Sequence, residues 1–301
     1  MNNKKYYAAA VSAFVVWGFF PWVLKSLGGY KAGEILYFRI FFSSVLLVLI
    51  VALIRNSKLQ KDFAIFKSYP SIDKVKVILL WLAGGLLLTI NWLTFIYTVN
   101  EINIRTASFS YLICPVLTAV LGYVVLKEEL TLTQWVAVLL CAVSCVLMGM
   151  NSVTELGYSF TTAITYGLYL VLQRLYKEFD RMTVLSVQIL FSFFLLNVAF
   201  GYLIDSVPVE TSFYLIIAVI AAAFTILPLF LNLYALIGIS SATVGILMYI
   251  NPIFNFTIAF LVFDEQVTTL QLTGYSIIGI ALVIFNYPNF RKLQAMRTSG
   301  L

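Results

Sequence analysis

Long apolar stretches follow one another along nearly the whole chain, and they limit its fold more than any other feature. Breaks at Gly, Pro or charged residues divide them into segments of about 20 residues, the length that a helix needs to cross a bilayer. The predicted spans are residues 6–26, 31–54, 76–98, 103–126, 131–150, 157–176, 183–204, 211–236, 240–263 and 268–288. Only 11% of the residues are charged, against about 25% in soluble domains. The sequence therefore predicts an all-α polytopic membrane protein with ten transmembrane helices.

The basic residues predict how these spans are oriented. With the N-terminus in the cytoplasm, 15 of the 19 Lys and Arg residues lie in cytoplasmic segments, three (Lys25, Lys31 and Arg105) lie outside, and Arg39 lies within the second span. Cytoplasmic loops carry an excess of Lys and Arg, so both termini are predicted to be cytoplasmic. The same asymmetry accounts for the net charge of +6 without a nucleic-acid partner.

Residue types needed for catalysis are scarce. The chain has no histidine, which removes the most frequent general base and metal ligand. The three cysteines, Cys114, Cys141 and Cys145, fall within apolar stretches and form neither a disulfide framework nor a metal-binding pattern. We therefore expect no enzyme activity, no metal and no cofactor, and a membrane-integral enzyme is the least favoured alternative.

An internal repeat relates the two halves of the chain. At a shift of 137 residues, YLICPVLTAVLGYVVLKEELTLTQ aligns without gaps with MYINPIFNFTIAFLVFDEQVTTLQ. At a shift of 149 residues, WGFFPWVLK aligns with YGLYLVLQR. The difference between the shifts fits a longer basic loop near residues 55–76. Residues 1–150 and 151–301 are thus predicted to be two repeats of five spans each.

The number of spans in each repeat determines its orientation. Because five is odd, the second repeat enters the membrane from the side opposite to the first. Inverted repeats of this kind are frequent in secondary transporters, which bind substrate near the middle of the membrane between the repeats. The charged turns KEEL and DEQV then mark one cytoplasmic and one external turn, and we interpret both as boundaries of spans.

Five stretches of the chain form one recognisable set: VVWGFFPWVLK, GEILYFRIFFS, NWLTFIYTVN, SYLICPVLTAVLGYVVLKEEL and MYINPIFNFTIAFLVFDEQ. Together they resemble the RarD branch of the EamA proteins, in the drug/metabolite transporter superfamily. The resemblance implies two inverted five-helix EamA repeats, a central cavity for a small organic solute, a prokaryotic inner membrane, and export rather than import. The chain departs from the family pattern at Cys114, where Asn is expected, and at Thr106, where an acidic residue is expected.

Arg39 is the strongest candidate for a binding residue. Charged groups inside a span are costly unless they face protein or water, and a guanidinium can hold a carboxylate through two parallel hydrogen bonds. The alternatives are an ion pair with Glu34 or a side chain that extends to the membrane surface. Gln188 occupies the equivalent position of the second repeat, which favours a role in the cavity.

The fourth and ninth spans carry small and polar residues at every fourth position, so each set lies along one helix face. Their functional interpretation is a pair of helices that line a cavity, and the alternative is close helix packing. The two sets are Thr106, Ser110, Cys114 and Thr118 in the fourth span, and Thr243, Leu247, Asn251 and Asn255 in the ninth.

Prolines and aromatic residues supply the other candidates. Pro21, Pro115 and Pro252 are predicted to act as hinges, because proline kinks a helix and frees a carbonyl; a packing kink is the alternative. Trp17 and its repeat equivalent Tyr166 form a predicted aromatic wall, although aromatic side chains also face lipid or fill cores. The remaining candidates for substrate binding are Asn91, Phe95, Tyr111, Asn232 and Tyr249.

These features predict a secondary transporter that moves a small organic metabolite, such as an amino acid or a drug-like solute, by alternating access. Glu34 is the one carboxylate that we place within a span as a candidate for ion coupling. The expected partners are a small-molecule substrate and the lipid bilayer, and a homodimer stays open. The alternative function is a non-transporting scaffold or a lipid-binding membrane protein.

Overall fold

The computed structural model describes residues 4–173, 175, 178–239 and 247–298, and its regular structure is helical throughout these residues. The first half contains α1 (Lys4–Lys25), α2 (Ala32–Leu49), η1 (Ile50–Ile54), α3 (Asn56–Ser68), α4 (Ser71–Tyr97), η2 (Thr98–Ile102), α5 (Ile104–Leu126) and α6 (Leu132–Asn151). The second half contains α7 (Val153–Leu172), α8 (Arg181–Val198), α9 (Phe200–Leu203), α10 (Thr211–Val219), η3 (Ile220–Ile226), α11 (Leu227–Gly238), α13 (Ile250–Leu261) and α14 (Thr269–Thr298). The η elements are π-helical turns.

Seven of these helical segments are long and apolar enough to cross a membrane. They are Lys4–Lys25, Ala32–Ile54, Ser71–Ile102, Ile104–Leu126, Arg181–Val198, Thr211–Asn232 and Thr269–Tyr287. The apolar helices Leu132–Met148 and Ile250–Leu261 are shorter, and α7 is more polar because its sequence includes Glu155 and several threonines. The prediction of an all-helical, multi-pass membrane protein is therefore confirmed, while the count of ten full spans is not.

Two further sequence predictions differ from the structure or fall outside it. The basic loop predicted near residues 55–76 contains a helix, α3, whose residues Ile65 and Phe66 pack against a small cluster of Val77, Phe179 and Val184. α11 ends at Gly238, between the predicted spans 211–236 and 240–263. Thr243, the first residue of the polar set in the ninth span, lies outside the described residues.

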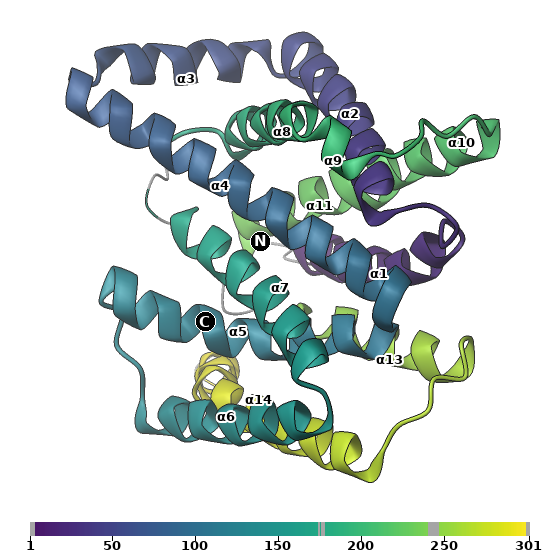
Figure 1. The fold of residues 1–301 in the computed structure, drawn as a ribbon. Helices are drawn as coiled ribbons and strands as arrows, with labels where there is room; N and C mark the ends of the chain where they lie inside the picture. The colour runs from purple at the N-terminus through teal and green to yellow at the C-terminus, as the bar shows by residue number, and fades with distance from the viewer. Residues whose placement is uncertain (1–3, 174, 176–177, 240–246, 299–301) are drawn as a thin grey trace.

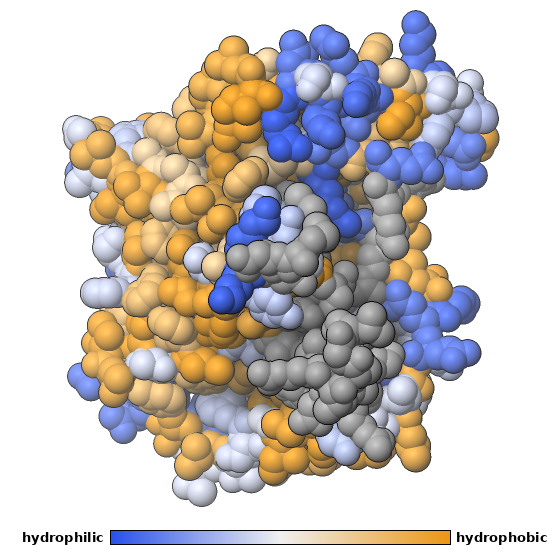
Figure 2. All heavy atoms as spheres, turned by 180° about the vertical axis from the view of Figure 1, so that it is seen from behind, coloured by the Kyte–Doolittle hydropathy of each residue, from blue (hydrophilic) through white to orange (hydrophobic). Residues whose placement is uncertain are grey.

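α4 crosses the middle of the molecule, with α2 and α8 on one side and α7 on the other (Figure 1). α1 packs against α11 and α13, and α6 packs along α14 at the edge of the molecule. The largest cluster of buried apolar side chains lies among α1, α2, α4, α8 and η3. Hydrophobic residues also cover much of the outer face in Figure 2, as a surface in contact with lipid requires.

The two charged turns related by the 137-residue shift share one backbone geometry. Lys127 and Asp264 both adopt the left-handed conformation, with φ of 58° and 48°. The N–H of the residue that follows, Glu128 or Glu265, donates to the carbonyl oxygen six residues earlier, at 3.2 Å and 3.0 Å. The equivalence found in the sequence is thus kept in the backbone of both turns.

The turn at Asp264 and Glu265 is more than the boundary that the sequence predicted. The Glu265 carboxylate accepts the backbone N–H groups of Ile104 and Arg105 at 2.8 Å and 3.1 Å, at the start of α5. It also accepts Nε of Arg105 at 3.0 Å, and both side chains are largely buried. A carboxylate is stabilised at a helix N-terminus, so this contact fastens the α13–α14 turn to the start of α5.

Candidate functional site

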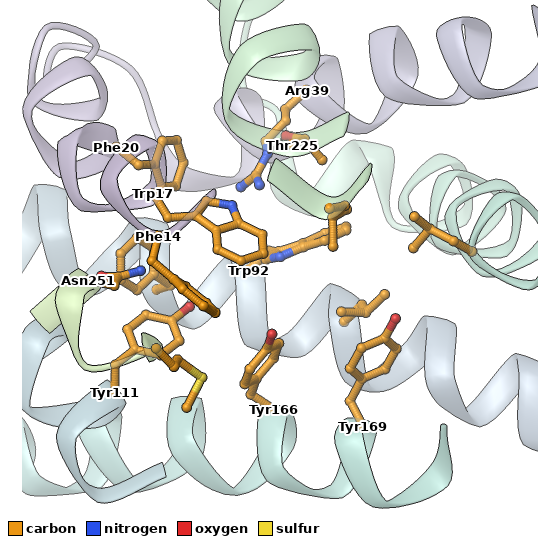
Figure 3. Close-up of a pocket in the computed structure, with 15 residues that line it drawn as sticks. Phe14, Trp17, Phe20, Arg39, Trp92, Tyr111, Tyr166, Tyr169, Thr225 and Asn251 are labelled. Carbon is orange, nitrogen blue, oxygen red and sulfur yellow. Dashed lines mark hydrogen bonds between the residues drawn. The ribbon is translucent and has the colours of Figure 1, made fainter. Parts of the chain in front are cut away.

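A cavity lies between the two halves of the chain, with a volume of about 60 Å³ for the centres of water-sized molecules. One water needs about 10–15 Å³ by this measure, so the cavity has room for several waters or a small solute. Its lining comes from both halves: Phe14, Trp17, Phe20, Arg39, Leu88, Trp92, Phe95, Tyr111, Tyr166, Tyr169, Leu185, Thr225, Leu229, Met248 and Asn251. Figure 3 shows these side chains converging from helices far apart in the sequence.

Aromatic rings form most of the wall. α1 contributes Phe14, Trp17 and Phe20, which are three residues apart and therefore share one helix face. Tyr166 and Tyr169 of α7 stack with their ring centroids 6.0 Å apart. In Figure 3 their hydroxyl groups point toward the cavity, on the side opposite Arg39. The wall is therefore apolar in its bulk, with phenol hydroxyls on one side and a cation on the other.

Arg39 supplies the only positive charge among the described residues that line the cavity. Its side chain is 3% exposed, and its guanidinium lies over the rings of Phe20 and Trp92 at 4.8 Å and 4.9 Å from their centroids. Its Nε donates to Oγ1 of Thr225 at 2.9 Å, while one terminal nitrogen, Nη1, is buried without a hydrogen-bond partner in the described structure. The guanidinium is thus held by one edge and points into the cavity with the other (Figure 3).

No protein carboxylate balances this charge in the part of the chain that the structure describes. All 13 Asp and Glu residues lie in that part, and none of them lines the cavity. The ion pair with Glu34 that the sequence left open is not observed among the described residues, and the Glu34 carboxylate accepts the backbone N–H of Lys31 at 3.1 Å instead. A buried charge without a partner is costly, so an anion that enters the cavity meets an unsatisfied cation.

The π-helical turn η3 anchors two of the lining residues. Pro228 has no N–H to donate to the carbonyl of Phe224, four residues earlier, and Nε1 of Trp17 donates to that carbonyl at 3.1 Å. The Thr225 hydroxyl donates to the carbonyl of Ile220 at 3.0 Å. π-helical turns are frequent at functional sites because they re-aim backbone and side-chain groups. Here the turn presents the carbonyl of Phe224 to Trp17 of α1 and the hydroxyl of Thr225 to Arg39 of α2.

Six of the predicted substrate-binding residues line the cavity, and six do not. Those brought together are Trp17, Arg39, Phe95, Tyr111, Tyr166 and Asn251. The other six are Asn91, Ser110, Cys114, Gln188, Asn232 and Tyr249, none of which is in the lining.

Most of these six have structural contacts elsewhere. Asn91 donates to the carbonyl of Thr162 at 2.7 Å and so joins α4 to α7. Ser110 donates to a carbonyl of its own helix at 3.1 Å. Cys114 is fully buried beside Thr118, and Tyr249 packs against the apolar cluster around α6 and α14. Asn232 is half-buried on α11, with a buried Oδ1 that has no hydrogen-bond partner in the described structure.

The predicted hinges and the coupling residue also have defined places. Pro21 and Pro115 stand inside α1 and α5. Pro252 lies in the first turn of α13, which begins at Ile250, where a missing N–H costs little; residues 240–246, which precede it in the predicted ninth span, lie outside the described residues. Glu34 is buried in the first turn of α2, where its hydrogen bond to Lys31 stabilises the start of the helix. Whether any of these residues moves during function stays a prediction.

Sequence reasoning missed nine lining residues, although the internal repeat relates many of the lining positions to one another. They are Phe14, Phe20, Leu88, Trp92, Tyr169, Leu185, Thr225, Leu229 and Met248. Five pairs of repeat-equivalent positions have both members in the lining: Trp17 and Tyr166, Phe20 and Tyr169, Leu88 and Thr225, Trp92 and Leu229, and Tyr111 and Met248. Applying the two shifts to the predicted residues adds only Met248, the equivalent of Tyr111, because both members of three other pairs are absent from the prediction.

The chain is similar to known transporters over nearly its whole length. The model of the EamA-like transporter family matches residues 4–150 and again residues 154–287. An "Uncharacterized transporter" of Vibrio cholerae is 31% identical over 98% of this chain and 96% of its own length. "Protein RarD" of Escherichia coli is 28% identical over 92% of both chains. The resemblance to RarD-like EamA proteins is thus confirmed.

A likeness in structure agrees with these matches. A solved crystal structure superposes on this chain with a TM-score of 0.66, covering 95% of this chain and 98% of the other, at 13% identity. At that identity the match shows a shared fold and nothing more. The family match and the names of the relatives indicate a multi-pass membrane transporter. Because the family model matches both halves, the chain belongs to the EamA-like transporter family.

Proposed function

We propose that this protein is a secondary transporter that carries a small organic anion or zwitterion by alternating access between two inverted five-helix repeats. The cavity geometry supports the inverted arrangement, since repeat-equivalent positions of both halves line one space. Sites between inverted repeats lie near the middle of the membrane and are exposed to each side in turn. On this proposal residues 1–150 and 151–301 are the two moving halves.

The observation that carries the proposal is the unbalanced charge of Arg39. A carboxylate placed at its free edge would form short, charge-assisted hydrogen bonds and would remove the cost of a buried cation. The rings around it, among them Trp17, Trp92 and Tyr166, would cover the apolar body of the solute. A substrate with one carboxylate and a compact, flat or apolar body fits both features.

The distribution of charge supports a topology for this cycle. We place both termini in the cytoplasm and the protein in a prokaryotic inner membrane, with export as the direction that the family resemblance favours. In this topology the Arg105–Glu265 contact is external, and Arg55 pairs with Asp180 at 2.6 Å on the cytoplasmic side. Both pairs join the first half to the second, so opening the cavity toward either side requires the contacts at that side to loosen.

Flux through proteoliposomes tests the proposal. Purified protein is reconstituted, and uptake is measured for labelled carboxylates, amino acids, neutral amides and amines. We expect saturable flux for at least one carboxylate or amino acid, and its loss in the Arg39→Ala variant. Saturable flux for amines or neutral amides alone would support a transporter but contradict an anionic substrate. A folded protein without saturable flux for any solute in the panel would support the scaffold alternative.

A further inference from the structure

The contact between Arg39 and Thr225 joins the two halves of the chain inside the cavity. Arg39 comes from α2 in the first half and Thr225 from η3 in the second. Their hydrogen bond, 2.9 Å long, is buried at both ends. The bond uses Nε of the guanidinium, so it leaves the edge formed by the two terminal nitrogens for other partners.

The direction of this bond is fixed by a second one. The Thr225 hydroxyl has one proton, which it donates to the carbonyl of Ile220 at 3.0 Å. Its oxygen is therefore left with lone pairs, and these accept the N–H of Arg39. Arg39, Thr225 and Ile220 thus form a short chain of hydrogen bonds, and a valine at position 225 would keep the shape and lose both bonds.

The remaining freedom of the guanidinium is limited by aromatic rings. It lies between Phe20 and Trp92, with centroid distances of 4.8 Å and 4.9 Å. Rings at this distance attract a cation to their faces and restrict how its plane can turn. With the plane held by rings and one edge held by Thr225, the buried Nη1 that lacks a partner is aimed at the cavity.

We infer that Thr225 is a positioning residue that makes the site selective for an oxyanion over a neutral group of the same shape. Thr225 does not touch the anion in this arrangement; it fixes the guanidinium so that both terminal nitrogens face the anion together. Preorganised donors bind more tightly because little conformational freedom is lost on binding. The inference rests on the proposed function, since it assigns a role within the same site.

The test compares phenylacetate with phenylacetamide, two solutes of nearly the same shape that differ in charge. Binding to the full-length protein in detergent is followed by quenching of tryptophan fluorescence, because Trp17 and Trp92 line the cavity. The wild type should prefer phenylacetate. Thr225→Val should lower this preference about tenfold, and Thr225→Ser, which keeps the hydroxyl, should stay within about twofold of the wild type.

A matched control separates positioning from general damage. Thr273 is an exposed threonine of α14 whose hydroxyl donates to a carbonyl of its own helix at 2.8 Å, and Thr273→Val should leave the preference unchanged. Thermal unfolding confirms that each variant is folded. If the wild type prefers phenylacetate and Thr225→Val retains that preference, the role of Thr225 is wrong and the anion site stands. If the wild type shows no preference, both the anion site and the inference fail.

Discussion

Arg39 and Gln188 occupy equivalent positions of the two repeats, and the structure uses them in opposite ways. Arg39 lines the cavity and lacks a partner at one terminal nitrogen. Gln188 is also buried, but it lies outside the lining, and its Oε1 accepts a hydrogen bond from Gln173 at 3.2 Å. Two halves that supply paired rings to one wall therefore supply a single charge. The two repeats are therefore alike in the aromatic residues that they contribute to the cavity and differ in the charged group.

The helices that these side chains meet explain the difference. Gln188 lies against Gly84 and Gly85 of α4, where a Cβ atom would come within 3 Å of it. At the 137-residue shift these glycines correspond to Ala221 and Ala222 of η3, each of which carries a methyl group. The partner positions differ as well: Thr225 receives Arg39, whereas its equivalent in the first half is Leu88. The asymmetry thus involves both helices of each contact.

Replacing Arg39 by glutamine, the residue type at the equivalent position 188, removes the charge difference between the repeats and should have the largest effect. Arg39→Gln removes the charge-assisted bonds to an anion, which contribute about 1.5–3 kcal/mol each. We expect the affinity for phenylacetate to fall about a hundredfold, or about 3 kcal/mol, with little change for phenylacetamide. Fluorescence titration measures both, and Arg39→Lys should give an intermediate loss because the charge is kept and the two-pronged geometry is not.

The same substitution carries a prediction of opposite sign for stability. Since Arg39 is a buried cation without a balancing carboxylate among the described residues, removing its charge should not destabilise the fold. Thermal unfolding of Arg39→Gln in detergent is expected at or above the wild-type temperature. An equal loss of affinity for both solutes, or a large loss of stability, would show that Arg39 holds the structure and does not select the ligand.

A methyl group added to α4 at Gly85 tests the contact of this helix with Gln188. In Gly85→Ala the new Cβ would lie 2.7 Å from the carbonyl oxygen of Gln188, which belongs to the backbone and cannot turn away. Overpacking of this kind costs about 1–3 kcal/mol, so the variant should unfold at a lower temperature while its preference for phenylacetate is kept.

Gly157 provides the matched control for this substitution. It stands in α7, and no atom beyond its chain neighbours and its own helix backbone lies within 4 Å of a Cβ built on it. Alanine is favoured over glycine in a helix by about 1 kcal/mol, so Gly157→Ala should be at least as stable as the wild type. Equal stability of the two alanine variants would mean that the α4–α8 contact is looser than the structure indicates.

Much of the fold could be predicted from the sequence because the membrane permits few alternatives. Apolar stretches of similar length, and repeat segments related by two constant shifts, predicted helices in two related halves. The turns at Lys127 and Asp264 keep that relation in their backbone. The helix α3 was missed because its apolar residues are few and pack on a local cluster with Phe179. The basic composition of residues 55–76 gives no sequence signal for this packing.

The candidate site was only half predictable, and the reason lies in how polar groups are satisfied in a membrane. Polarity within a span pointed to Ser110 and Asn91, but their side chains bond to backbone carbonyls, as small polar groups in helices often do. Aromatic lining residues such as Trp92 were missed because 16% of the chain is aromatic, so composition does not single them out. Thr225 faces the cavity from a π-helical turn, and a pattern search based on the α-helical period does not predict such a turn.

Trp17 and Tyr166 form a second equivalent pair that sharpens the comparison. The polar atom of Trp17 is committed to the protein, since Nε1 donates to the carbonyl of Phe224. Trp17→Phe should remove this hydrogen bond and cost about 1 kcal/mol of stability. Trp22, half-exposed on the same helix, supplies the control, and Trp22→Phe should unfold at the wild-type temperature. Similar unfolding temperatures for the two variants would show that the hydrogen bond from Trp17 to the carbonyl of Phe224 does not stabilise the fold.

Tyr166 should show the smallest effect, and on a different quantity. Its hydroxyl has no hydrogen bond to a described residue and points into the cavity in Figure 3. Tyr166→Phe therefore removes no bond within the protein, and its stability should stay within about 0.5 kcal/mol of the wild type. Affinity should fall by at most about tenfold for solutes with a second hydrogen-bonding group, such as 4-hydroxyphenylacetate, and stay unchanged for phenylacetate. A drop in unfolding temperature as large as that of Trp17→Phe would mean that both members of the pair are structural, and that the ligand is recognised at Arg39 alone.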